Sequence, residues 1–154
     1  HSSHTMNTYS TMRARRDADF VRCLRRTLED HAHEQPTVKR LMLLTLRKPA
    51  PQYYVSYGYA LRVLRERRSG LRSRYKERST EHMWQTIEKA VARLRERHNL
   101  SVGEALQRVL TEGRAPAFFI APTTAQRIYQ ESLAIHSRNS RSSQQTINLN
   151  TPVK

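Results

Sequence analysis

The sequence is poor in the residues that build several common kinds of site. It has one cysteine, Cys23, so an internal disulfide and a zinc site made of cysteines are excluded. Its four glycines are scattered, which rules out a glycine-rich phosphate-binding loop. The longest apolar run, residues 41–44, is far too short to cross a bilayer. We therefore expect a chain without a membrane span and, by default, a cytoplasmic location.

Acidic residues are also scarce. The chain of 154 residues has 13 Asp and Glu against 28 Lys and Arg, which gives a net charge of +15. A charge of this size opposes compaction by self-repulsion and is typical of proteins that meet a polyanion. Of the 28 cations 23 are arginine, whose guanidinium suits phosphate and guanine edges. Codon bias in a GC-rich genome would produce the same excess of arginine.

Two stretches of the chain match each other without a gap. Residues 50–64 and 115–129 align at a constant offset of 65, with Ala-Pro, a later alanine and an arginine identical. Tyr53 and Tyr54 stand opposite Phe118 and Phe119. A longer amphipathic stretch and a shorter one precede each Ala-Pro, which predicts a long helix followed by a short one. The pattern indicates an internal duplication.

We therefore expect a mainly α fold of two tandem divergent three-helix units of about 65 residues. Each unit has a short extended Pro-aromatic segment before its third helix, because proline lacks the N–H and disfavours helix in its predecessor. The expected boundaries are 1–12 (a tag remnant and disordered N-terminus), 13–70 (unit 1), 71–79 (a basic connector), 80–136 (unit 2) and 137–154 (a disordered tail).

Turn and capping residues place the expected helix ends. Pro36 separates the first two helices, Ser56 is positioned to cap the third, and Gly70 suits its C-terminal cap. In the second unit, Ser101 and Glu104 form a capping-box pattern, and Gly113 ends that helix. We expect the four paired aromatic rings to be buried, and a short strand pairing between the two Ala-Pro segments is possible.

The positive charge is uneven along the chain. Residues 17–70 of unit 1 carry +5 and the connector +3, whereas unit 2 carries only +1. The densest run begins on the expected third helix of unit 1 and continues through the connector, and such a run can follow a phosphate backbone. The alternative is a solvated helix face followed by a flexible linker. The predicted nucleic-acid-binding residues are Tyr57, Arg62, Arg65, Arg67, Arg68, Arg72, Arg74, Lys76 and Arg78.

The sequence gives little indication of a catalytic site or a metal site. His31 and His33 are two residues apart and point in different directions on a helix, and no third ligand follows His31 and Glu34 at a useful spacing. Acidic residues occur singly among arginines, where ion pairing accounts for them. We expect no enzyme activity, no metal and no cofactor.

Two resemblances add to this interpretation. Residues 55–64, Val-Ser-Tyr-Gly-Tyr-Ala-Leu-Arg-Val-Leu, resemble the recognition half of a LacI-type helix-turn-helix. That resemblance implies that Tyr57, Gly58 and Arg62 lie near the major groove. The repeated Pro-Ala-Pro-aromatic-aromatic-Val-Ser motif is similar to small uncharacterised bacterial proteins of mobile elements, which implies that setting and no activity.

The sequence thus favours a non-enzymatic nucleic-acid-binding protein, with DNA favoured over RNA, in regulation or as an accessory to a mobile element. The alternative is a helical protein-interaction or structural module whose basic surface meets an acidic partner. A homodimer, or a protein partner bound through unit 2, is compatible with either hypothesis. No membrane contact is expected.

Overall fold

The computed structural model describes the backbone of residues 2–150 and the side chains of residues 10–141. Within these residues the protein is mainly helical, as predicted, and no strand is present. The elements are α1 (Ser2–Asp30), a 3-10 turn (Ala32–Glu34), α2 (Val38–Leu46), α3 (Tyr57–Ser69), α4 (Arg78–His98), α5 (Val102–Glu112) and α6 (Pro122–Asn150).

Side-chain caps determine where the shorter helices begin. The Ser56 hydroxyl accepts a hydrogen bond from the Tyr59 N–H, and Ser101 does the same for the Glu104 N–H, as their sequence positions predicted. Thr37 caps α2 in the same way. Gly70 ends α3 in the left-handed conformation that glycine adopts without strain, so this prediction is also confirmed.

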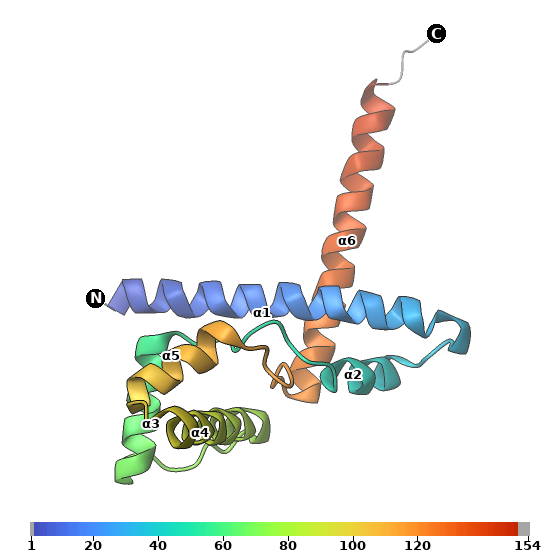
Figure 1. Cartoon of the computed structure of the whole chain (residues 1–154). Helices are drawn as coiled ribbons and strands as arrows, with labels where there is room; N and C mark the ends of the chain where they lie inside the picture. Colours follow the sequence, from blue (N-terminus) through green and yellow to red (C-terminus); the bar gives the residue numbers. More distant parts are fainter. Residues whose placement is uncertain (1, 151–154) are drawn as a thin grey trace.

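The helices form two groups (Figure 1). In the first group α1 packs against α2, and α6 packs against both. In the second, α5 packs against α4 and α3. The third helix of each predicted unit therefore contacts the other unit's short helix, so that helix packing crosses the predicted boundary between units.

The two Ala-Pro segments meet between these groups. Ala50 and Ala115 form an antiparallel β-bridge, with N···O distances of 2.9 and 3.1 Å in the two directions. Tyr53 stacks on Phe119 and Tyr54 on Phe118, with ring centroids 6.1 and 6.3 Å apart. Tyr53 and Phe118 are buried, whereas Tyr54 and Phe119 are half-buried. The pairing suggested by the sequence for these two segments is therefore present as a single β-bridge, and the aromatic rings stack in pairs beside it.

One hydrophobic core runs through both groups. Phe20 and Leu24 of α1 and Trp84 and Ile87 of α4 are almost completely buried, as the helical spacing of the apolar residues predicted. Phe20 also packs edge-on against Phe118, with centroids 5.4 Å apart. The core therefore includes residues from the segment between α5 and α6 as well as from the helices.

The first and last helices reach into the two terminal segments that the sequence predicts to be disordered. The structure continues α1 back to Ser2 and α6 to Asn150, and the second half of α6 extends away from the other helices (Figure 1). Neither helix contains an internal proline or glycine, so nothing in the sequence interrupts either helix once packing has nucleated it. Residue 1 and residues 151–154 of the predicted disordered ends lie outside the described residues.

Among the described residues, no helix combines the length and the apolar composition that crossing a bilayer requires.

Candidate nucleic-acid interface

The outward side of α3 carries a row of arginines. Ala60, Val63 and Leu64 are buried on the inner side of the helix. Arg62 and Arg65 lie three residues apart on the opposite, exposed side, and Arg68 follows at the same spacing. The apolar spacing of α3 therefore directs these three guanidinium groups to solvent.

Arg67 belongs to the inner side of α3 and is not available to a ligand. Its guanidinium donates two hydrogen bonds to the Glu81 carboxylate, at 2.8 and 2.9 Å, and a third to Glu88 at 3.0 Å. Only 10% of its side chain is exposed. The pKa of Arg67 is raised, chiefly by the hydrogen bonds to Glu81. The sequence predicted Arg67 as an exposed contact residue, whereas in the structure its side chain is largely buried and ties α3 to α4.

Arg72 is also paired within the protein. It forms an ion pair with Glu66 and donates a hydrogen bond to the Tyr75 hydroxyl at 3.2 Å. Its guanidinium also lies 5.8 Å from the Tyr75 ring centroid. Arg72 therefore helps to hold the connector in place.

The last two residues of the predicted connector, 78 and 79, belong to α4, and the remainder, residues 71–77, is attached to the helices through Tyr75. The Tyr75 ring stacks on Trp84 with centroids 6.3 Å apart, and Tyr59 packs against the same indole at 6.0 Å. The Tyr75 N–H donates to the Glu81 carboxylate at 3.0 Å. Burial, followed by the contact with the Tyr59 hydroxyl, raises the pKa of Tyr75 to about 12. The basic residues next to Tyr75 therefore extend from an anchored segment rather than from a flexible linker.

Six cations of the predicted set remain exposed. They are Arg62, Arg65, Arg68, Arg74, Lys76 and Arg78. None of the six forms an ion pair or a side-chain hydrogen bond with any described residue. Arg62 lies over the Tyr59 ring at 5.4 Å, which restricts its position without neutralising its charge. We call these six residues the α3 surface.

Tyr57 lies at the edge of the α3 surface. A β-carbon placed on Gly103 of α5 would come within 2.8 Å of the Tyr57 hydroxyl oxygen. The tip of Tyr57 is therefore directed toward α5, and the small size of Gly103 makes room for it. This orientation is unlike that of a side chain that extends outward to a base.

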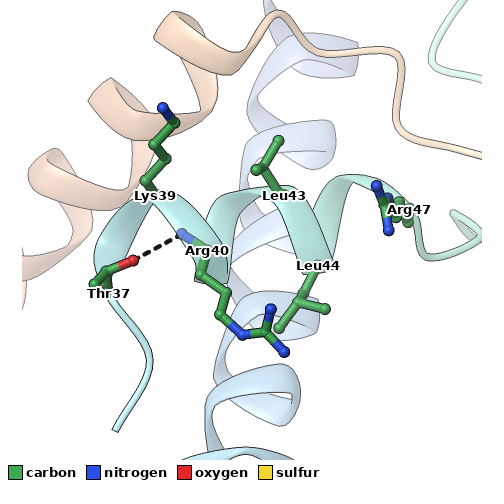
Figure 2. A pocket seen from close by; sticks show the side chains of 6 residues that line it. All are labelled: Thr37, Lys39, Arg40, Leu43, Leu44 and Arg47. Atoms are coloured by element: carbon green, nitrogen blue, oxygen red, sulfur yellow. Dashed lines mark hydrogen bonds between the residues drawn. The ribbon is translucent and has the colours of Figure 1, made fainter.

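A second basic surface was not predicted from the sequence. Thr37, Lys39, Arg40, Leu43, Leu44 and Arg47 line a hollow of about 270 Å³ on the outer side of α2 (Figure 2). One sequence signal was available, since no Asp or Glu occurs between Glu34 and Glu66. The density of arginines is lower in α2 than in α3, so charge density alone does not indicate this surface, whereas the absence of acids does.

The groups considered for a metal site do not cluster. Within the described residues no three His, Cys, Asp or Glu side chains are arranged to hold an ion. His31 and Glu34 form a hydrogen-bonded pair at 3.1 Å near the end of α1. This contact closes the turn after α1.

The structure places the segment that resembles a helix-turn-helix as follows. Its last helix, α3, begins at Tyr57 after the Ser56 cap, with Gly58 and Arg62 exposed. The helix before it in the chain, α2, packs against α1 and α6.

No known family model, curated protein or solved structure matches this chain.

Proposed function

We propose that the protein binds nucleic acid through the α3 surface, without catalysis, and that duplex DNA is its preferred ligand. The observation that carries this proposal is the contrast among the arginines of one charge run. Arg67 and Arg72 are paired with acids, whereas the six cations of the α3 surface have no such partner among the described side chains. Exposed cations without acidic partners are the groups that can replace the counterions of a phosphate backbone.

The aromatic contacts support a duplex over a single strand. Proteins that bind single strands stack bases on exposed aromatic rings. Here Tyr75 packs on Trp84, and Tyr53 and Tyr54 stack on Phe119 and Phe118. The two exposed rings are also engaged, because Tyr59 packs edge-on against Trp84 with Arg62 over its ring, and the Tyr57 hydroxyl is directed toward Gly103. A capped helix with an outward row of arginines suits the major groove, which admits an α-helix.

We also infer that the chain arose by duplication of one unit of about 65 residues. The caps Thr37 and Ser101 are 64 residues apart, and the bridged alanines Ala50 and Ala115 are 65 apart. The stacked pairs are reciprocal, because Tyr53 meets the counterpart of Tyr54, and Tyr54 meets the counterpart of Tyr53. A duplicated nucleic-acid-binding unit whose copies diverge fits a regulatory protein or an accessory of a mobile element.

The binding proposal is tested by titrating the protein with a duplex of about two helical turns, with one of its strands and with an RNA of the same sequence. The variant R62Q/R65Q/R68Q removes three charges from the α3 surface. The control K89Q/R93Q/R97Q removes three exposed charges from α4. Circular dichroism and thermal unfolding check that both variants keep the fold.

We expect the duplex to bind most tightly and its affinity to fall steeply between about 50 and 200 mM salt. The α3 variant should lower the affinity for the duplex about tenfold or more and reduce the slope of log affinity against log salt concentration by about 2 to 3. The control variant should change both quantities much less. Equal losses in the two variants would show that net charge alone drives binding. Tighter binding of the single strand would overturn the preference for duplex.

A further inference from the structure

The outer side of α2 combines features that a phosphate-binding surface does not need. Figure 2 shows Lys39 and Leu43 on one side of this face, and Arg40 and Leu44 on the other. Leu43 is 45% exposed, and Leu44 is half-buried. The result is a shallow apolar strip flanked by three cations.

The fold itself does not require leucines at these positions. The inner side of α2 buries Leu41, Met42 and Thr45. In α5, the residues 64 positions later, Ala105, Leu106 and Val109, are buried in the same order. The residues in the corresponding outer positions of α5 are Gln107 and Arg108, both polar. A helix that packs in the same way as α2 therefore does not need leucines on its outer side.

The charge of the face restricts what can cover it. Lys39 and Arg47 form no ion pair with any described residue, and Arg40 has only a loose contact with Glu34 at 3.8 Å. A second copy of this chain, with its own charge of +15, would be repelled. A nucleic acid would meet the cations with its phosphates but would leave Leu43 and Leu44 without an apolar partner.

We propose that the outer face of α2 is a docking site for an acidic amphipathic helix of a protein partner. An apolar side chain of the partner packs on Leu43 and Leu44, and its carboxylates pair with Lys39, Arg40 and Arg47. This is the helix-in-groove mode of recognition, in which apolar anchors provide affinity and charges provide orientation.

The site is separate from the α3 surface. α2 belongs to the group formed with α1 and α6, whereas α3 belongs to the group with α4 and α5 (Figure 1). The proposal therefore does not depend on nucleic-acid binding. If both proposals hold, the protein can hold a nucleic acid and an acidic protein at the same time.

The test uses the whole protein and a designed helical peptide of about 16 residues, a length at which helices become stable in water. The peptide carries leucines at i, i+3 and i+7 on one side and glutamates around them, with alanine elsewhere. A second peptide replaces its leucines with alanine, and a third replaces its glutamates with glutamine. Binding is measured by fluorescence anisotropy at about 150 mM salt, where exposed charges alone are largely screened.

The key variant is Leu43→Gln, which introduces the residue type that α5 has at the corresponding position. Its matched control is Leu71→Gln, since Leu71 is a leucine of the connector with 82% exposure. We expect Leu43→Gln to weaken binding of the first peptide about tenfold or more, because the leucine side chain loses its buried contact. Leu71→Gln should leave it unchanged, and both altered peptides should bind at least tenfold or so more weakly.

Three outcomes would overturn the proposal. The first is no binding of the leucine–glutamate peptide at about 1 mM, the weak end of measurable affinity. The second is equal binding to wild type and Leu43→Gln, which would mean that only charge attracts the peptide. The third is a loss of duplex DNA binding in K39Q/R40Q/R47Q as large as the loss of peptide binding, which would assign this face to the nucleic acid.

Discussion

Arg65 and Arg67 are two residues apart on α3 and have opposite environments. Arg65 is exposed and has no acidic partner in the part of the chain whose side chains are described, whereas Arg67 is held by Glu81 and Glu88. The density of positive charge in the sequence does not distinguish these two arginines, so both were predicted to lie in the interface. The helical period could have done so, because residue 67 lies on the same side as the apolar residues 60, 63 and 64.

Replacing Arg67 should therefore affect stability, whereas replacing Arg65 should not. Arg67→Gln leaves Glu81, a buried carboxylate, without its bidentate partner. We expect it to lower the free energy of unfolding by about 3 kcal/mol. Arg65→Gln, on the exposed side, should change it by less than about 0.5 kcal/mol. Urea denaturation compares the two variants, and equal values would show that the pair with Glu81 contributes no net stability.

The same pair predicts how stability depends on pH. Hydrogen bonds from Arg67 lower the pKa of Glu81 to about 2 in the folded protein. A carboxylate with a lowered pKa stabilises the fold above its unfolded pKa of about 4.3, and this contribution is lost as the pH falls toward 2.

We therefore expect wild type to lose more unfolding free energy between about pH 5 and pH 2 than Glu81→Gln does. Glu112→Gln, an exposed position at the end of α5, should behave as wild type. Denaturant unfolding at several pH values gives the comparison. Parallel pH profiles of wild type and Glu81→Gln would contradict this interpretation.

At the scale of single elements, helices with local start and stop signals were predicted well. Ser56 and Gly70 mark the two ends of α3, and Ser101 marks the start of α5. The order in the connector was not predicted, because it depends on contacts with α4. Tyr75 is held by Trp84 and Glu81, and no short-range pattern relates these residues to it.

Removing this anchor should free the connector. In Tyr75→Ala the ring contact with Trp84 is lost, and a lost aromatic contact of about 1 kcal/mol corresponds to roughly fivefold more frequent local opening. We expect trypsin to cut after Arg72, Arg74 and Lys76 at least that much faster. Mass spectrometry identifies the fragments. The control Tyr57→Ala should be cut at the wild-type rate, and equally slow cleavage in Tyr75→Ala would show that other contacts hold the connector.

At the scale of the whole molecule, the sequence predicted the helices but not how they pair. Ala60 and Val63 of α3 and Ala125 and Ile128 of α6 are buried at corresponding positions 65 residues apart. Helices with such similar inner sides can pack on either half, so periodicity cannot choose between pairing within a unit and pairing across units. The exposed face of α2 also depends on this pairing, because the packing of α2 against α1 and α6 determines which of its leucines face solvent.

Pairing across the units should hold the chain together after a break in the connector. We expect fragments 1–74 and 75–154, produced together, to form a one-to-one complex, because α3 packs on α5 and α6 packs on α1 and α2. Size-exclusion chromatography with light scattering measures the mass of the complex. A complex that forms and unfolds cooperatively fits this arrangement, whereas two fragments that elute separately without denaturant would contradict it.

The packing of α6 on α1 and α2 has a consequence for biosynthesis. Helices α3, α4 and α5 follow one another along the chain, so they can assemble as soon as residue 112 has left the ribosome. Helices α1 and α2 can pack on each other early, but their contacts with α6 must wait, because its buried Ile128 is made 82 residues after the end of α2. At translation rates of about 5 to 20 residues per second, this delay lasts about 4 to 16 s. The apolar inner side of α2, which includes Leu41 and Met42, is therefore incompletely packed during this delay and offers a surface that chaperones can bind.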